Sequence, residues 1–396
     1  MKALILGEIK KVFSQKFVII LAALLLLVNI FTCYYQIVIS SDYWYLKKIN
    51  GEIYALAEGE IKEGSADRLY AYRDEIQSAL DNNIKVKTYS VNKDTELMNI
   101  RNVIDSLNSF KGYSSLISEV KRNTTSQAEI LKNKENTYLL KLNEKIDRTY
   151  GEREITKFYC RDGLREALSY DFSSVVILLL IILACSSSFA HEKETQMNGL
   201  LFSCENGRKK LSFAKKISCI LFAVCTGAVF YLTDLIVFMI TIGYKGFLLP
   251  LYAVEGYEYT PLTMSVFSFM SLSAVIKIFG FIIIAMLTCV FSSILDKSFA
   301  VFASSLISVI ALMGIGTFAD EKFMYLSLIN PMKLLSNRSM FKAFDVIRLF
   351  GSPVGRFPVT FVLSLVLLVL LFLAVRLLNN KGQRRAKNEA SSKRKL

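Results

Sequence analysis

Long apolar runs constrain this chain more than any other feature. A run of 23 residues forms about 35 Å of α-helix, which is enough to cross the roughly 30 Å hydrocarbon core of a bilayer. Hydrophobic residues make up 53% of the 396 positions, and the first 249 residues contain no proline that would interrupt a helix. The pattern predicts an all-α polytopic membrane protein with six transmembrane helices, at 17–39, 172–190, 217–242, 275–295, 298–318 and 358–378.

Two segments near the N-terminus, residues 1–16 and 17–39, each allow two interpretations. Residues 1–16 put Ile5, Ile9, Val12 and Phe13 on one helical stripe, which predicts an amphipathic helix in the membrane interface. An extension of the first span fits the same residues. The run at 17–39 could also belong to a cleaved signal peptide, but it is long for one and no Ala-x-Ala site follows. We therefore expect a retained first span.

The net charge of +14 lies mainly beside the apolar runs. Residues 1–16 carry four basic and one acidic residue, 191–216 six and three, and 376–396 eight and one. The most polar stretch, 40–170, is neutral, with 21 residues of each sign. Lys and Arg concentrate in cytoplasmic loops, whereas a nucleic-acid-binding domain would gather them on one soluble unit. The distribution predicts a membrane protein with no nucleic-acid partner, both termini and loop 191–216 in the cytoplasm, and a basic cytoplasmic tail at 379–396.

This orientation places residues 40–171 outside the cell, as a large domain inserted between the first two spans. Two apolar stripes at helical spacing predict helices there, and a third set approximates a heptad seam across 128–149. We expect helix breaks near 59–65, 82–92, Gly112 and Gly151. A spacer or a dimer-contact module explains such a domain more simply than a dedicated receptor. The first two stripes are Leu69, Tyr72, Ile76 and Leu80, and Leu97, Ile100, Ile104 and Leu107.

The second half of the chain contains two irregular regions. Residues 262–295 are apolar for about 51 Å of helix, too long for one span. We therefore predict an interfacial helix at 262–274 and a span at 275–295, with Lys277 extending to the outer boundary. Residues 319–357 would be external despite six basic and three acidic residues, and a re-entrant segment at 326–335, broken at Asn330 and Pro331, would explain this.

Chemistry-bearing residues are few. Asp234 lies in the third run, eleven residues or about 16 Å before Lys245 and near the bilayer middle, so we expect it either in a translocation path or as a packed structural acid. His191 is the one histidine, which excludes HExxH zinc sites, and no GxSxG or P-loop motif is present. The seven cysteines form no paired CxxC pattern. The sequence predicts no enzyme and no metal or other cofactor in this chain.

Loop 191–216 contains an acidic residue, a glycine, a Leu-rich segment and then Arg and Lys before the third span. These residues are Glu194, Gly199, Leu200, Leu201, Phe202, Ser203, Arg208 and Lys215. The pattern resembles the second-to-third span loop of type 2 ABC exporter permeases, in which such residues couple the permease to its ATPase. The match covers roughly 1–40 and 172–380, and Asn330-Pro331 also resembles a family feature.

The resemblance implies a function. The loop would form a coupling helix on a separate cytoplasmic ATPase, which binds ATP and Mg, in a bacterial plasma membrane. A second permease chain, identical or related, would complete a path exporting a peptide-like, antibiotic-like or lipid-like substrate. Two alternatives remain at this point: a membrane-anchored sensory or structural protein whose outer domain binds a partner, and a four-span ABC permease that transmits force. Six spans would favour the exporter over the four-span type.

Overall fold

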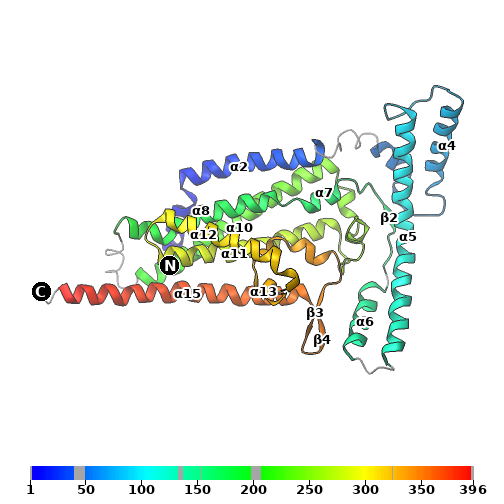
Figure 1. Ribbon diagram of the computed structural model, residues 1–396. Helices are drawn as coiled ribbons and strands as arrows, with labels where there is room; N and C mark the ends of the chain where they lie inside the picture. Colours follow the sequence, from blue (N-terminus) through cyan, green and yellow to red (C-terminus); the bar gives the residue numbers. More distant parts are fainter. Residues whose placement is uncertain are drawn as a thin grey trace.

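The computed structural model describes residues 2–39, 50–132, 137–151, 153–197, 207–322 and 324–393. For residues 39, 207–209, 317–322, 324–326 and 379–393 it describes the backbone alone. Figure 1 shows a bundle of long helices running side by side, with an inserted domain at one end and the C-terminus beyond the other. We call these ends the domain end and the loop end; at the loop end α8 (Phe172–Glu194) stops and α10 (Gly207–Ile242) starts.

Six helices in the described residues are long and apolar enough to cross a membrane, which confirms the prediction of a mostly helical chain with six such segments. The most apolar 18 residues of α8 and of α11 (Val266–Ile294) are 72% and 56% buried, so these two helices form the centre of the bundle. The peripheral helices expose apolar side chains that a bilayer would cover. They are α2 (Lys16–Tyr34), α10, α12 (Ser298–Lys322) and α15 (Arg356–Lys393).

The N-terminal residues form a helix of their own. Helix α1 (Lys2–Phe13) ends before α2 begins, so the segment is not an extension of the first long helix. Val12 is buried, and the ring of Phe13 meets that of Phe222 on α10 edge to face at 5.3 Å. Helix α1 thus packs on the bundle at its loop end. Beyond α2, a π-helical turn, η1 (Tyr35–Ile39), leads to the domain end.

The predicted split of residues 262–295 is wrong, because α11 is one continuous helix of 29 residues. Ser265 caps it by accepting a hydrogen bond from the backbone N–H of Ser268. Helix α11 is longer than one bilayer crossing requires. Its first turns do not need to lie among lipid head groups, because protein covers them. Val266 and Phe269 are fully buried, and the ring of Phe269 contacts the rings of Tyr257 and Phe341, both at 5.7 Å.

Between α12 and α15 the chain turns back into the bundle. Helix α13 (Met324–Ile329) ends at Asn330 and Pro331, and α14 (Met332–Leu335) follows. A Cβ on Gly280, midway along α11, would lie 2.9 Å from the side chain of Leu335. The absence of that Cβ lets α14 approach α11 closely. After the 3-10 helix η4 (Asn337–Phe341), strands β3 (Val346–Leu349) and β4 (Ser352–Gly355) pair antiparallel.

The inserted domain is mainly helical, and Figure 1 shows its longest helix, α5 (Lys93–Lys132), lying across the end of the bundle. The predicted break at Gly112 is wrong, because α5 continues through it. Both predicted stripes face the domain's core. Helices α5 and α6 pack side by side, so residues 128–149 do not form one continuous seam. The other elements are β1 (Gly59–Glu60), α4 (Asp67–Asp81), α6 (Thr137–Tyr150), β2 (Lys157–Phe158), paired antiparallel with β1, and α7 (Leu164–Ser169).

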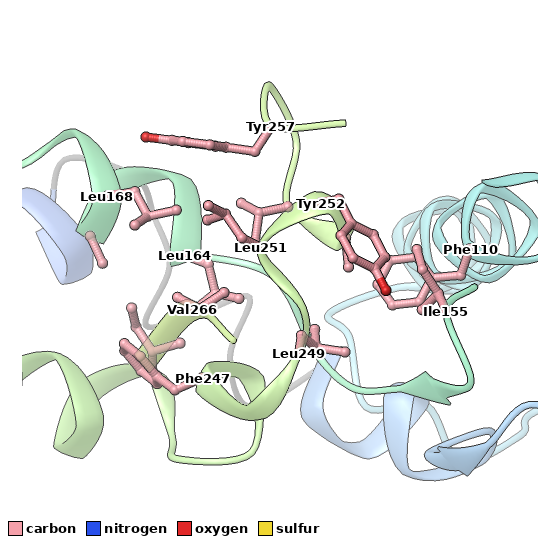
Figure 2. Packing of buried hydrophobic residues seen from close by; sticks show 14 of the residues in the cluster. Phe110, Ile155, Leu164, Leu168, Phe247, Leu249, Leu251, Tyr252, Tyr257 and Val266 are labelled. Carbon is pink, nitrogen blue, oxygen red and sulfur yellow. The ribbon is translucent and has the colours of Figure 1, made fainter. Parts of the chain in front are cut away.

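The inserted domain packs on the connection between α10 and α11, which contains 3-10 helices η2 (Gly246–Leu248) and η3 (Leu251–Ala253). Figure 2 shows Phe110 and Ile155 of the domain beside Leu249 and Tyr252 of this connection. Arg153, 6% exposed, donates hydrogen bonds to backbone oxygens of residues 260 and 261 at 2.5 and 2.8 Å. One apolar cluster therefore extends from the domain into the end of the bundle.

Candidate functional site

The predicted coupling residues fall into two groups. Helix α10 starts at Gly207, so Arg208 lies in its first turn, where the backbone alone is described. Glu194 and Lys215 lie on either side, in α8 and α10. The remaining predicted residues fall outside the described part of the chain; they are Gly199, Leu200, Leu201, Phe202 and Ser203.

Lys215 is bound inside the loop end of the bundle. Its side chain is 1% exposed, and its ammonium lies 2.5 Å from Oε2 of Glu192, the last acid but one of α8. It also donates a hydrogen bond to the backbone oxygen of Ser188 at 2.7 Å. Lys11 of α1 reaches the other oxygen of the same carboxylate at 3.4 Å. Glu192 therefore joins α1, α8 and α10 immediately before the loop.

Glu192 was not among the predicted coupling residues, although its residue type explains its position. A lysine in an apolar helix needs a nearby acid. Glu192 lies in the last turn of α8 and Lys215 in the third turn of α10, on the two sides of one loop. Glu8 of α1 lies near the same cluster, and burial raises its pKa, against the attraction of Lys215 and Lys11. The loop end thus combines two acids and two lysines within a few turns of helix.

Glu194 contacts the start of α12 rather than the loop between α8 and α10. Its carboxylate accepts a hydrogen bond from Ser298, the first residue of α12, at 3.1 Å. Lys193 beside it donates to the backbone oxygens of Ser293 and Leu295 at 2.7 and 3.2 Å. The end of α8 therefore also holds the tight turn between α11 and α12. Four helices and α1 meet at the base of the predicted coupling loop.

A second ion-paired cluster lies at the domain end. Asp171, the residue before α8, is shared by two cations: Lys277 of α11 contacts its Oδ1, and Arg338 of η4 lies 3.5 Å from the same atom. The prediction that Lys277 extends to the outer boundary is wrong, since this side chain is 1% exposed. Arg338 also donates to the backbone oxygen of Tyr170 at 2.7 Å.

Asp234 belongs to the neighbourhood of this second cluster. It lies about 12 Å from the domain end of α10 and about 28 Å along the helix from Lys215. Asn29 of α2 donates to its Oδ1 at 2.6 Å. The hydroxyl of Tyr170 donates in turn to Oδ1 of Asn29 at 2.8 Å. This chain of bonds makes Asp234 a packed acid that links α2 and α10 to the start of α8.

Two cavities lie on opposite sides of the Asp171 cluster. The first, about 260 Å³, lies between α10 and α11, and we call it the α10–α11 cavity; Asp234, Lys277 and Arg338 are its charged lining residues. The second, about 600 Å³, lies between α8, α12 and α14 and includes Asp171 and Lys333. Asp171 thus faces one cavity while the cations that it binds face the other.

Within the described residues, no group of three or more His, Cys, Asp or Glu side chains could hold a metal ion. The polar side chains that the bundle brings together are suited to binding and to holding helices in place. No protein-family description, curated protein or solved structure matches this chain.

Proposed function

We propose that this chain is the membrane-spanning permease subunit of an ATP-driven ABC exporter. A separate cytoplasmic ATPase would bind ATP and Mg, and a second permease chain would complete the path. The exported substrate would be peptide-like, antibiotic-like or lipid-like. The observation that carries the proposal is the ion-paired base at the loop end, where Glu192 joins α1, α8 and α10 beside the loop.

A loop that receives force from a partner must be attached to helices that move together. The buried contact of Lys215 with Glu192, and the hydrogen bond from Ser298 to Glu194, provide that attachment on both sides of residues 198–206. In the proposed mechanism, ATP binding closes the ATPase pair and pulls on the loop. The pull tilts α2, α8 and α12, and the path opens at the domain end.

Six membrane-length helices support the exporter over the four-span force-transmitting permease. A sensory or structural protein would require no ATPase, and it would not need the Leu-rich segment that lies between acidic and basic residues in loop 191–216. Recovery of the chain from native membranes separates the two, because an ABC ATPase identified by mass spectrometry is expected only for the permease.

The decisive experiment replaces Leu201 and Phe202 with Asp in one chain and measures copurification with that ATPase. Two carboxylates in an apolar docking surface should abolish association and transport. The matched control replaces Ile84 and Met98, exposed apolar residues of the inserted domain, with Asp. The control should copurify normally. Association and transport that persist in the Leu201 and Phe202 variant would refute the coupling assignment.

A further inference from the structure

The α10–α11 cavity opens on the outer surface of the bundle. Leu232 of α10 and Val275 of α11 line it and are 59% and 63% exposed. On a membrane-spanning helix such side chains face acyl chains. A molecule dissolved in the bilayer can therefore reach this cavity without passing through the bundle.

The inner wall of the cavity carries two cations that share one acid. Lys277 is 1% exposed and Arg338 14%, whereas the side chain of Asp171, which both contact, is 47% exposed. A buried ammonium requires a negative partner, but that partner need not be Asp171. Because Asp171 also lines the second cavity, it can be solvated there when another anion takes its place.

From these observations we infer that the α10–α11 cavity binds the anionic head group of an amphipathic molecule, with Lys277 and Arg338 holding a carboxylate or phosphate. Arginine and lysine both favour these groups, and charge-assisted hydrogen bonds are the stronger kind. Asp234 lines the cavity too, but its Oδ1 already accepts from Asn29. It lies on α10, whereas the two cations come from α11 and η4.

The size of the cavity indicates an amphipathic ligand. A volume of about 260 Å³ is smaller than the roughly 300–1,000 Å³ of pockets that enclose a drug-sized ligand. The cavity would hold a head group and the first carbons of a chain, while the rest of the chain remains in the bilayer. Apolar lining residues such as Phe238 and Met270 suit those first carbons.

The test uses the full chain in phosphatidylcholine nanodiscs with a photoreactive oleate as probe. Labelling should concentrate on peptides that contain Leu232, Met270 and Val275. Oleate should compete at least about tenfold better than methyl oleate, which lacks the charge, since one charged contact is worth about that factor. Competition by dioleoyl phosphatidate would identify a phospholipid head group as the source of the anion. Failure of the phosphatidate to compete, with oleate still competing, would identify a free fatty acid.

Three variants probe the charges and the volume separately. Asp171→Asn should strengthen oleate binding severalfold, because it removes the acid that competes for both cations. The pair Asp171→Asn with Lys277→Gln removes one cation without leaving an acid unpaired, and should weaken binding about tenfold. Ala274→Phe keeps every charge and fills the cavity, so it should abolish site labelling. Lys333→Gln, which changes the second cavity, is the control and should leave labelling unchanged.

Several results would overturn the inference. They are labelling spread evenly over the exposed faces of the helices, equal competition by methyl oleate, full competition by inorganic phosphate, or normal labelling of Ala274→Phe. The test requires no ATPase, so it can succeed where the proposed function fails. That the bound molecule is exported cargo rests on the proposed function, and ATP-driven release of the probe would be measured separately.

Discussion

The two ends of α8 each hold one acid that is shared by two cations from other segments. Asp171 precedes the helix and Glu192 lies in its last turn, about 32 Å further along, close to the roughly 30 Å thickness of a bilayer's hydrocarbon core. Their environments differ. The side chain of Glu192 is 11% exposed, and that of Asp171 is 47% exposed. The cations are Lys277 and Arg338 at the domain end, and Lys11 and Lys215 at the loop end.

This difference in exposure separates two uses of the same arrangement. An enclosed carboxylate cannot leave its lysine without leaving a charge unpaired, so Glu192 holds helices together permanently. A carboxylate that faces a cavity can exchange its partners for water or for another anion. Under the two proposals above, the enclosed acid would suit the loop end to transmit force, and the exchangeable acid would suit the domain end to exchange ligands. Substitutions at the two ends should distinguish these roles.

The largest effect is expected for Glu192→Gln. It leaves the ammonium of Lys215 buried without its acid, and loss of one partner of a buried pair costs about 3–5 kcal/mol. The thermal midpoint of the purified chain in detergent should fall clearly. Glu194→Gln is the control, because that side chain is exposed, and it should change the midpoint little. The pair Glu192→Gln with Lys215→Met should recover much of the loss. An unchanged thermal midpoint in Glu192→Gln would contradict the role of Glu192 in holding α1, α8 and α10 together.

An intermediate effect is expected for Asn29→Leu at the domain end. Leucine has a similar volume but cannot donate to Asp234, so that buried carboxylate loses a partner, whereas the hydroxyl of Tyr170 keeps the backbone oxygen of residue 29 as acceptor. Such a loss costs about 1–3 kcal/mol. Asn29→Asp would place two acids together and should be worse. A variant as stable as the parent chain would mean that Asp234 has another donor at this position.

A smaller effect is expected for Asp171→Asn, although it too removes an acid shared by two cations. Lys277, which this change leaves without its acid, is as buried as Lys215. However, Lys277 and Arg338 line the α10–α11 cavity, so water can reach their charges, and we expect a cost of about 1 kcal/mol. The loss of stability in Glu192→Gln, divided by the loss in Asp171→Asn, measures how differently the two acids are enclosed. Equal losses in detergent thermal unfolding would refute the distinction between an enclosed and an exchangeable acid.

The parts of this fold that the sequence predicted are those set by residues close together in the chain. The six apolar runs and the stripes of α4 and α5 are periodic within one helix, so single-sequence reasoning finds them. The failures concern partners far apart. Asp171 pairs with Lys277, and Glu192 pairs with Lys215. Neither partner could be chosen from spacing along the sequence alone. The break placed near residue 274 assumed that excess apolar length must lie in lipid, whereas Tyr257 of the α10–α11 connection and Phe341 of η4 cover it.

The same limit applies to the candidate site. Spacing along the helix predicted the distance of Asp234 from the outer end of the third span, but it left open whether the acid lines a path or packs against protein. Helix α10 begins at Gly207, before the predicted start at 217, and Asp234 lies about 12 Å from its domain end at Ile242. The type of residue was informative, since an acid in such a helix was expected to face protein. Its actual partner, Asn29, lies 205 positions earlier in the chain.

The smallest effect is expected for Glu8→Gln, and its sign depends on pH. Burial raises the pKa of Glu8 in the folded chain, so the folded state holds this proton more tightly than the unfolded state. The resulting stability is fully present below the usual carboxyl pKa and is lost as pH rises through the raised value. At neutral pH the ionised carboxylate opposes the packing of α1, and Gln relieves this. The variant should therefore melt slightly above the parent chain at pH 7.

The pH dependence provides the control for this prediction. As pH falls, Glu8 becomes protonated and resembles Gln, so the difference between the two melting midpoints should shrink toward zero. A variant that melts below the parent at pH 7 would indicate that the attraction of Lys11 and Lys215 exceeds the cost of burial. Glu8 would then be a second acid, beside Glu192, that holds the helices together at the loop end.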